Sequence, residues 1–277
     1  MMKAKLFRKS GVAALAALIL LQSAAPLLCA EALRLPDPLG YGKRLWGDIK
    51  ELPSKPAGWN KTQWYLAGGA LAATGAAFLV DGKIHAFYDK HRKSNKTLKE
   101  ISRLTTHFGD SVYQVPLISG LWLGGRLFNS PVMTKIAADA TEASVIAALM
   151  INPTLTYLTG RALPSKGENA MKFRPFTFHR YSFPSGHTSA AFALASVLDV
   201  DLRETFGHWH TPIVYGIAFG VAESRLYDDK HYLSEVILGG AIGWSVGRWI
   251  ASKKRAPGPG DISLLPYPGG MMVAARF

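Results

Sequence analysis

The chain has 277 residues, of which 48% are hydrophobic, so it can bury the core of one large domain with short extensions. Its 32 lysines and arginines outnumber 19 acidic residues, and the net charge of +13 predicts an anionic partner. No zinc-finger spacing, RNA-binding aromatic signature or base-reading basic helix accompanies this charge. The composition therefore favours phosphate esters and anionic lipid headgroups and predicts no nucleic-acid partner.

The first 30 residues have the pattern of an export signal. They begin with a basic stretch, continue as an apolar run over 12–21 and end in small residues at Ala30. We interpret 1–30 as a secretory signal peptide, with an N-terminal membrane segment as the alternative because no strong small-x-small cleavage site is present. The single cysteine, Cys29, lies in this segment, so no disulfide can form within one chain.

Residues 31–61 are polar and interrupted by prolines, and we interpret them as a lead-in segment. Six apolar stretches follow inside a predicted domain over 62–251. The fourth and fifth contain only about ten apolar residues, which suits buried core helices better than membrane spans. The six stretches are 64–80, 112–128, 136–158, 188–198, 213–221 and 233–250.

The last segment, 252–277, is predicted to be a Pro/Gly linker and a C-terminal tail. A run of prolines and glycines over 256–260 ends the domain. The flanks 262–267 and 271–277 surround a Pro-Gly-Gly sequence, a pattern that is compatible with a small β-hairpin.

The most informative segment is Pro-Ser-Gly-His at 184–187, which directly precedes an apolar run. This order places backbone amides and a hydroxyl at a helix N-terminus, which is a ready-made anion site. Farther along, Arg225 closes one apolar stretch, and His231 and Glu235 stand four residues apart at the start of the next. That spacing puts an imidazole and a carboxylate on one helix face, where the carboxylate can hold the ring's tautomer.

Together these segments resemble the second and third signatures of the type 2 phosphatidic acid phosphatase superfamily. That superfamily also contains bacterial class A acid phosphatases and vanadium haloperoxidases, and the likeness covers roughly 62–251. It implies an all-α fold, a six-helix bundle that is embedded in a membrane or associated with one.

The resemblance also implies a role for each residue in phosphoryl transfer, which needs a nucleophile, an acid and donors around the phosphate. His231 would attack phosphorus to form a phosphohistidine, Glu235 would orient its ring, and His187 would protonate the leaving group. No metal or cofactor is implied, and only a haloperoxidase would use vanadate. The phosphate-binding residues would be Ser185, Gly186, Arg225 and Arg161.

The first signature of the family, Lys, six residues and Arg-Pro, is altered here. It aligns with 156–164, where Thr156 stands in place of the lysine and Leu163 in place of the arginine. A charge-assisted contact to phosphate contributes about 1.5–3 kcal/mol, so losing two could reduce the rate by orders of magnitude. Candidate substitutes lie on the following loop: Lys166, Lys172 and Arg174.

Three hypotheses follow from these residues. The first is a phosphatase that acts on a phosphorylated lipid or a small phosphate ester. The second is a phosphate- or lipid-binding relative that has lost turnover, and the third is a vanadium-dependent haloperoxidase. We predict an exported protein of the bacterial cell envelope whose site faces the periplasm. If all six stretches crossed the bilayer, however, the site and the basic segment 83–103 would be cytoplasmic.

Overall fold

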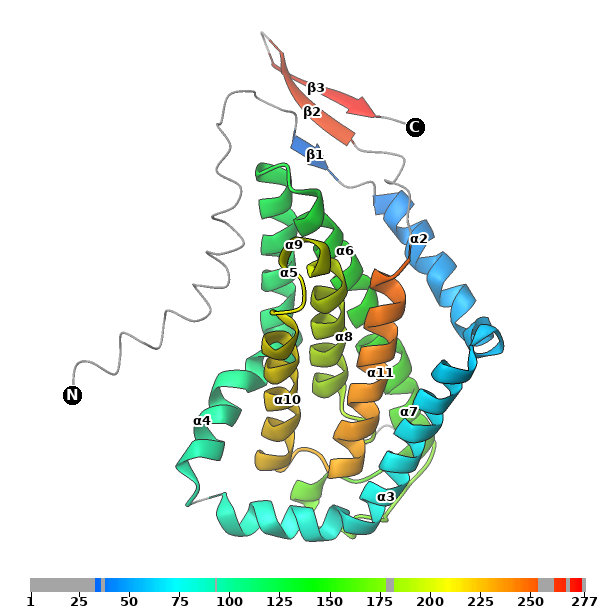
Figure 1. The fold of residues 1–277 in the computed structure, drawn as a ribbon, viewed down its shortest axis with the longest axis vertical. Helices are drawn as coiled ribbons and strands as arrows, with labels where there is room; N and C mark the ends of the chain where they lie inside the picture. Colours follow the sequence, from blue (N-terminus) through cyan, green and yellow to red (C-terminus); the bar gives the residue numbers. More distant parts are fainter. Residues whose placement is uncertain are drawn as a thin grey trace, which may run out of the picture.

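The computed structural model describes residues 33–35, 38–92, 94–177, 182–253, 262–267 and 270–275, so the predicted signal segment 1–30 lies outside it. Helices dominate the described chain, which confirms the all-α prediction (Figure 1). They are α2 (Pro38–Glu51), α3 (Lys61–His91), α4 (Lys96–Thr105), α5 (Ser111–Leu127), α6 (Pro131–Ser144), α7 (Asn152–Thr159), α8 (Gly186–Asp201), α9 (Arg203–Phe206), α10 (Thr211–Tyr227) and α11 (Leu233–Ala251).

All six predicted apolar stretches lie in helical structure. Five fall in α3, α5, α8, α10 and α11, whereas the third is divided between α6, a π-helical turn (Val145–Ile151) and α7. Pro153 lies in the first turn of α7 and lacks the backbone N–H that a regular continuation of α6 would use. The described residues also form α2, α4 and α9, so the predicted count of six helices is not confirmed.

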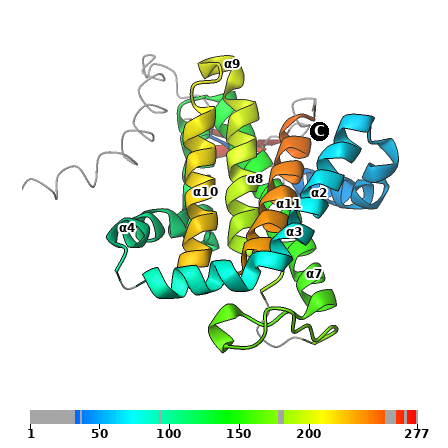
Figure 2. The same ribbon diagram turned by 60° about the horizontal axis from the view of Figure 1, so that its bottom comes forward.

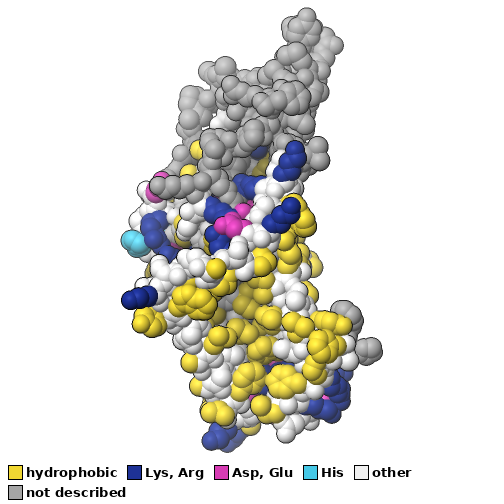
Figure 3. Space-filling model, turned by 90° about the vertical axis from the view of Figure 1, so that its right-hand side faces the viewer, with side chains coloured by type: hydrophobic (Ala, Val, Ile, Leu, Met, Phe, Trp, Pro, Cys, Tyr) yellow, Lys and Arg dark blue, Asp and Glu magenta, His cyan; other side chains and the backbone are white. Residues whose placement is uncertain are grey.

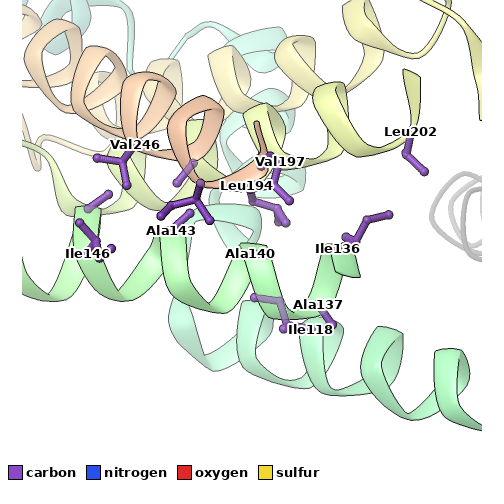
Figure 4. Packing of buried hydrophobic residues seen from close by; sticks show 14 residues of the cluster. Ile118, Ile136, Ala137, Ala140, Ala143, Ile146, Leu194, Val197, Leu202 and Val246 are labelled. Atoms are coloured by element: carbon purple, nitrogen blue, oxygen red, sulfur yellow. The ribbon is translucent and has the colours of Figure 1, made fainter. Parts of the chain in front are cut away.

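Helix α8 is the centre of the bundle and packs closely against α11. Glycines permit this approach, since a Cβ at Gly243 would lie 2.1 Å from a backbone carbonyl oxygen of α8. A large apolar cluster fills the space between these two helices, α5 and α6 (Figure 4). Burying each large side chain in it contributes about 1.5–3 kcal/mol. Its larger members are Ile118, Ile136, Ile146, Leu194, Val197, Leu202, Val246 and Ile250.

One end of the bundle gathers the helix termini that carry the predicted motifs. Helix α8 begins there, α10 ends there and α11 begins there, at the bottom of Figure 1. The second half of α3 crosses this end, and α3 packs against α11 (Figures 1 and 2). The fold therefore brings segments that are far apart in the sequence to one place.

Exposed apolar side chains cover a broad part of one side of the molecule (Figure 3). Within the described ranges, α3 is the one helix that is long and apolar enough to cross a membrane. Only 17% of its most apolar window is buried, and Tyr65, Leu71 and Leu79 on it are 77%, 64% and 84% exposed. Contiguous apolar surface of this kind marks a membrane or protein interface.

The lead-in contains a helix that the sequence did not predict. Pro38 lies in the first turn of α2, a position that proline tolerates, and the helix ends before Pro53. Arg44 of α2 donates to two buried carboxylates of α6, Asp139 at 2.5 Å and Glu142 at 3.2 Å. These ion pairs attach the lead-in to the bundle.

The tail pairs with the beginning of the described chain. Strands β1 (Leu33–Leu35), β2 (Ile262–Tyr267) and β3 (Gly270–Ala275) form an antiparallel sheet in the order β1-β2-β3. Strands β2 and β3 occupy the two flanks considered for a hairpin, and the second begins at Gly270. The sheet lies at the end of the bundle opposite the gathered termini (Figure 1).

Candidate active site

The start of α8 has the geometry of an anion site. Ser185 is its N-cap, and the buried Ser185 hydroxyl oxygen accepts from the Thr188 amide at 3.4 Å and from the Thr188 hydroxyl at 2.9 Å. The first-turn amides of Gly186 and His187 have no acceptor within the helix. The Ser185 amide donates to the Glu235 carbonyl oxygen at 3.0 Å, which fixes the start of α8 against the start of α11.

His231 and Glu235 form the predicted pair. The two groups are 2.9 Å apart, and with the proton on Nδ1, His231 donates to Glu235 Oε2. The histidine side chain is 12% exposed and the carboxylate is fully buried. The Tyr232 amide donates to the same oxygen at 3.1 Å, and the Ser182 hydroxyl donates to Oε1 at 2.6 Å. This tautomer leaves the lone pair of His231 Nε2 free to attack.

Arg225 supplies the positive charge of the site. Its guanidinium is 8% exposed and lies 3.1 Å from Asp228 Oδ2, and it also donates to the Thr106 hydroxyl. Its Nε donates to the Ser224 hydroxyl at 3.2 Å. These contacts hold the side chain at the end of α10, where motif spacing predicted it.

His187 is held in its neutral form. Burial lowers the pKa of His187 to about 4, the positive charge of Arg225 and the nearby His231 ring act in the same direction, and Asp110 partly offsets this shift. The Asp110 carboxylate lies 4.0 Å from His187 Nε2. A bound phosphate would add negative charge and favour the protonated ring that a general acid needs. The His231 amide donates to the Arg225 carbonyl oxygen at 3.2 Å, and the start of α8, which carries His187, is hydrogen-bonded to Glu235, so the three residues lie at one end of the bundle.

Arg161 lies behind the site, although the family resemblance implied that it binds phosphate. Its side chain is 0% exposed, and Nη1 lies 3.1 Å from Glu235 Oε1. Nη2 donates to Asp81 Oδ2 at 2.6 Å, Nη1 donates to the Ser234 hydroxyl at 2.7 Å, and Nε donates to the Ala170 carbonyl oxygen at 2.8 Å. A fully buried guanidinium with these partners contacts Glu235 and has no face open to an anion.

The candidate substitutes for the altered motif pair with their own loop. Lys172 Nζ lies 3.2 Å and Arg174 Nη2 3.4 Å from the Glu168 carboxylate, and both cations are about half exposed. Lys166 is exposed at the end of a short 3₁₀ turn (Pro164–Lys166). Among the residues described, no hydrogen bond or ion pair links these three cations to His231, His187 or Arg225.

Sequence patterns did not identify Asp81, Ser182, Thr106 or Asp110 as site residues. Asp81 directly follows an apolar stretch, and a single acidic residue at the end of such a stretch is the sequence feature that could have marked it as a site residue. The other three belong to no motif and reach the site only through the tertiary fold. In the described part of the chain, no three His, Cys, Asp or Glu side chains form a group that could hold a metal ion.

A cavity of about 370 Å³ adjoins His187. It lies between α5, α6 with its π-helical turn, and the first turn of α8. Its lining is mainly apolar away from the histidine, so it could hold an apolar group attached to a phosphate. The apolar lining residues are Val115, Ile118, Val145, Ala148, Leu149 and Ala190.

Comparisons with known proteins identify the region that contains this site. Residues 142–256 match the model of the PAP2 superfamily, which is the type 2 phosphatidic acid phosphatase superfamily. The lipid A 1-phosphatase of Porphyromonas gingivalis is 33% identical over 100 residues, which cover 33% of this chain and 22% of that protein. The chain thus spans less than a quarter of the length of that curated relative.

Two solved structures are similar to this chain. One is a transmembrane PAP2-type phosphatidylglycerolphosphate phosphatase from Bacillus subtilis, with 22% identity and a TM-score of 0.46 over 67% of this chain and 92% of that one. The other is LpxE from Aquifex aeolicus, with 20% identity and a TM-score of 0.42 over 61% of this chain and 94% of that one.

Proposed function

We propose that this protein, which belongs to the PAP2 superfamily through residues 142–256, is a phosphatase of a phosphomonoester or lipid (pyro)phosphate that works through a phosphohistidine. The observation that carries the proposal is the His231–Glu235 pair beside the first turn of α8, with Arg225 on the same end of the bundle. These groups supply a nucleophile, an anion site and a fixed positive charge.

The proposed reaction has two steps. His231 Nε2 attacks phosphorus, the bond from phosphorus to the leaving oxygen breaks, and that oxygen takes a proton from His187. Water then attacks the phosphohistidine, neutral His187 accepts its proton, and inorganic phosphate leaves as His231 is restored. Glu235 stabilises the positive ring formed in the first step, because its carboxylate accepts from Nδ1.

A lipid phosphate is the substrate class that we favour. The cavity at His187 has mainly apolar walls, and the leaving group must lie next to the side chain that protonates it. The relative from P. gingivalis is named for a lipid phosphate substrate, and the exposed apolar side of α3 supports contact with a membrane. We further propose export to the periplasmic face of the cell envelope, where such a protein could meet lipid headgroups.

A binding relative without turnover is the second candidate. The altered motif favours it, because Thr156 and Leu163 carry no charge and the neighbouring cations Lys172 and Arg174 pair with Glu168. Phosphate release by the intact protein distinguishes the two candidates.

The test measures phosphate release from an aryl phosphate and from phosphatidate in detergent micelles, with trapping of an acid-labile phosphoprotein. We expect turnover by the parent and its loss in His231→Ala, because every substrate needs the nucleophile. His208→Ala is the matched control, since His208 is exposed near α9 and away from the site. More than about a tenth of parent activity in His231→Ala would show that His231 is not the nucleophile. Binding of phosphatidate without release would favour the second candidate.

A further inference from the structure

We propose that Asp81 is a positioning residue for His231, acting through Arg161 and Glu235. The inference rests on the proposed function and extends it to a residue of α3 outside the family signatures. It also assigns Arg161 a role other than phosphate binding. Its basis is a buried connection between the two carboxylates through one guanidinium, which donates a hydrogen bond to Asp81 and forms an ion pair with Glu235.

Asp81 joins α3 to the first turn of α11. Its side chain is fully buried, Oδ1 accepts from the Ser234 amide at 2.9 Å, and Oδ2 accepts from the Ser234 hydroxyl at 2.6 Å. Arg161 Nη2 donates to Oδ2 at 2.6 Å. Asp81 and Ser234 are 153 residues apart, and α3 reaches α11 where it crosses the end of the bundle (Figure 2). The carboxylate also lies at a helix N-terminus, where negative charge is favoured.

Arg161 bridges Asp81 and Glu235 and has no freedom to turn elsewhere. Its guanidinium lies over three aromatic rings, 4.7 Å from the centre of Phe78, 5.6 Å from that of Phe173 and 4.3 Å from that of Tyr232. These cation–π contacts, the three hydrogen bonds described above and the ion pair with Glu235 fix its plane. Glu235 therefore receives Arg161 on Oε1 and His231 on Oε2 in one fixed orientation.

The charge count gives Asp81 a specific effect on His231. Two carboxylates share one guanidinium in this buried network, so one negative charge remains to stabilise the positive ring formed on attack. Without Asp81, Arg161 would neutralise Glu235 alone, and the carboxylate would stabilise that ring less. The charged and titratable groups around this network are Asp81 and His85 of α3, Arg161, His187 of α8, Arg225, Asp228 and Asp229 at the end of α10, and Tyr232 and Glu235 of α11.

The test replaces Asp81 by its uncharged isostere in the full chain. For Asp81→Asn we expect kcat on an aryl phosphate to fall about 10- to 100-fold while KM stays within about threefold, as for residues that orient a reacting ligand. The acid limb of the kcat/KM profile should move to lower pH by about half a unit or more, because a negative charge near His231 is lost. Asp199→Asn is the matched control, since Asp199 is also a buried, ion-paired acid but lies at the other end of α8.

A charge-balanced variant separates electrostatics from folding. In Asp81→Asn with Arg161→Gln, Glu235 again faces His231 with one net negative charge, so kcat and the acid limb should return toward parent values. A purely structural role predicts a larger loss in the double variant and an unchanged pH profile, and either result would overturn the proposal. The double variant also provides the test if Asp81→Asn alone does not fold.

A measurement without turnover distinguishes failure of this inference from failure of the proposed function. Vanadate can take a five-coordinate geometry on a histidine nitrogen, and calorimetry can compare its Kd with that of phosphate. We expect Asp81→Asn to weaken vanadate binding about tenfold and phosphate binding less than about threefold. If the parent releases no phosphate but this difference appears, the proposed function fails and the role of Asp81 stands. Equal effects on both ligands would remove that role.

Discussion

The protonation of His187 gives the sharpest prediction about catalysis. Burial, the positive charge of Arg225 and the nearby His231 ring hold the pKa of His187 at about 4. With that value, roughly one ring in a thousand is protonated at pH 7 and about one in eleven at pH 5 in the free protein. The acid form predominates only below about pH 4 and is lost as pH rises through that value, so leaving-group protonation is favoured by acid.

We therefore expect kcat/KM for an alkyl phosphate to fall from pH 5 to pH 7 more steeply than for an aryl phosphate. An aryl leaving group needs little protonation, and a general acid contributes about 10²- to 10⁴-fold to the reaction of a poor one. His187→Ala should reduce alkyl phosphate hydrolysis by that factor and aryl phosphate hydrolysis by less than about tenfold. The difference in pH dependence between the two substrates should disappear in this variant.

The assay follows both esters between pH 4 and 8 for the parent, His187→Ala and Asp110→Asn, with His208→Ala as the surface control. Asp110 raises the pKa of His187. In Asp110→Asn this pKa should fall, so the rate of alkyl phosphate hydrolysis should be lower than in the parent, whereas the rate of aryl phosphate hydrolysis should be nearly unchanged. Equal losses on both esters in His187→Ala would refute a general-acid role. A parent ratio of alkyl to aryl rates that does not change with pH would refute the electrostatic argument.

Two further predictions concern the fold, and denaturant unfolding measures both. Gly243→Ala should destabilise the protein by about 1–3 kcal/mol or more, because the new Cβ would lie 2.1 Å from a carbonyl oxygen of α8. Gly216→Ala, where nothing lies within 4 Å of the new Cβ, should be neutral or stabilising by up to about 1 kcal/mol, and similar losses in both variants would contradict the packing argument. Arg44→Ala should cost about 3 kcal/mol, because it removes a cation from the buried carboxylates of Asp139 and Glu142, and an unchanged unfolding midpoint would show that α2 does not need these ion pairs.

Local spacing predicted the helices and the His231–Glu235 pair well, because both depend on residues within one or two turns. The i, i+4 separation alone put the imidazole and the carboxylate within reach, and the observed 2.9 Å contact confirms it. Apolar runs likewise located the central helices. These features need no knowledge of what packs against them.

Features that depend on tertiary packing could not be predicted in this way. Asp81 meets Ser234 only because α3 crosses the end of the bundle, and no local pattern encodes that crossing. The sequence of the altered motif shows that Arg161 is charged but not which way it points. Its burial between Asp81 and Glu235 depends on α3, on α11 and on the bridge that Arg161 forms with Phe173 after α7. Helix α2 was not predicted, because the prolines around it indicated that any long helix would be interrupted there.

The position of Arg161 clarifies what the altered motif changes. His231 lies at the same end of the bundle as the candidate anion site in front, with Arg225 and the first turn of α8, and contacts a buried network behind it that retains one net negative charge. Thr156 and Leu163 remove cations that the family motif would supply in front, whereas the network behind is complete. Under the proposed function, losing two charge-assisted contacts of about 1.5–3 kcal/mol each would weaken the binding of phosphate and of its transition state. The contacts that orient His231 remain in place, so under the proposed function the sequence change alone would not remove the chemistry.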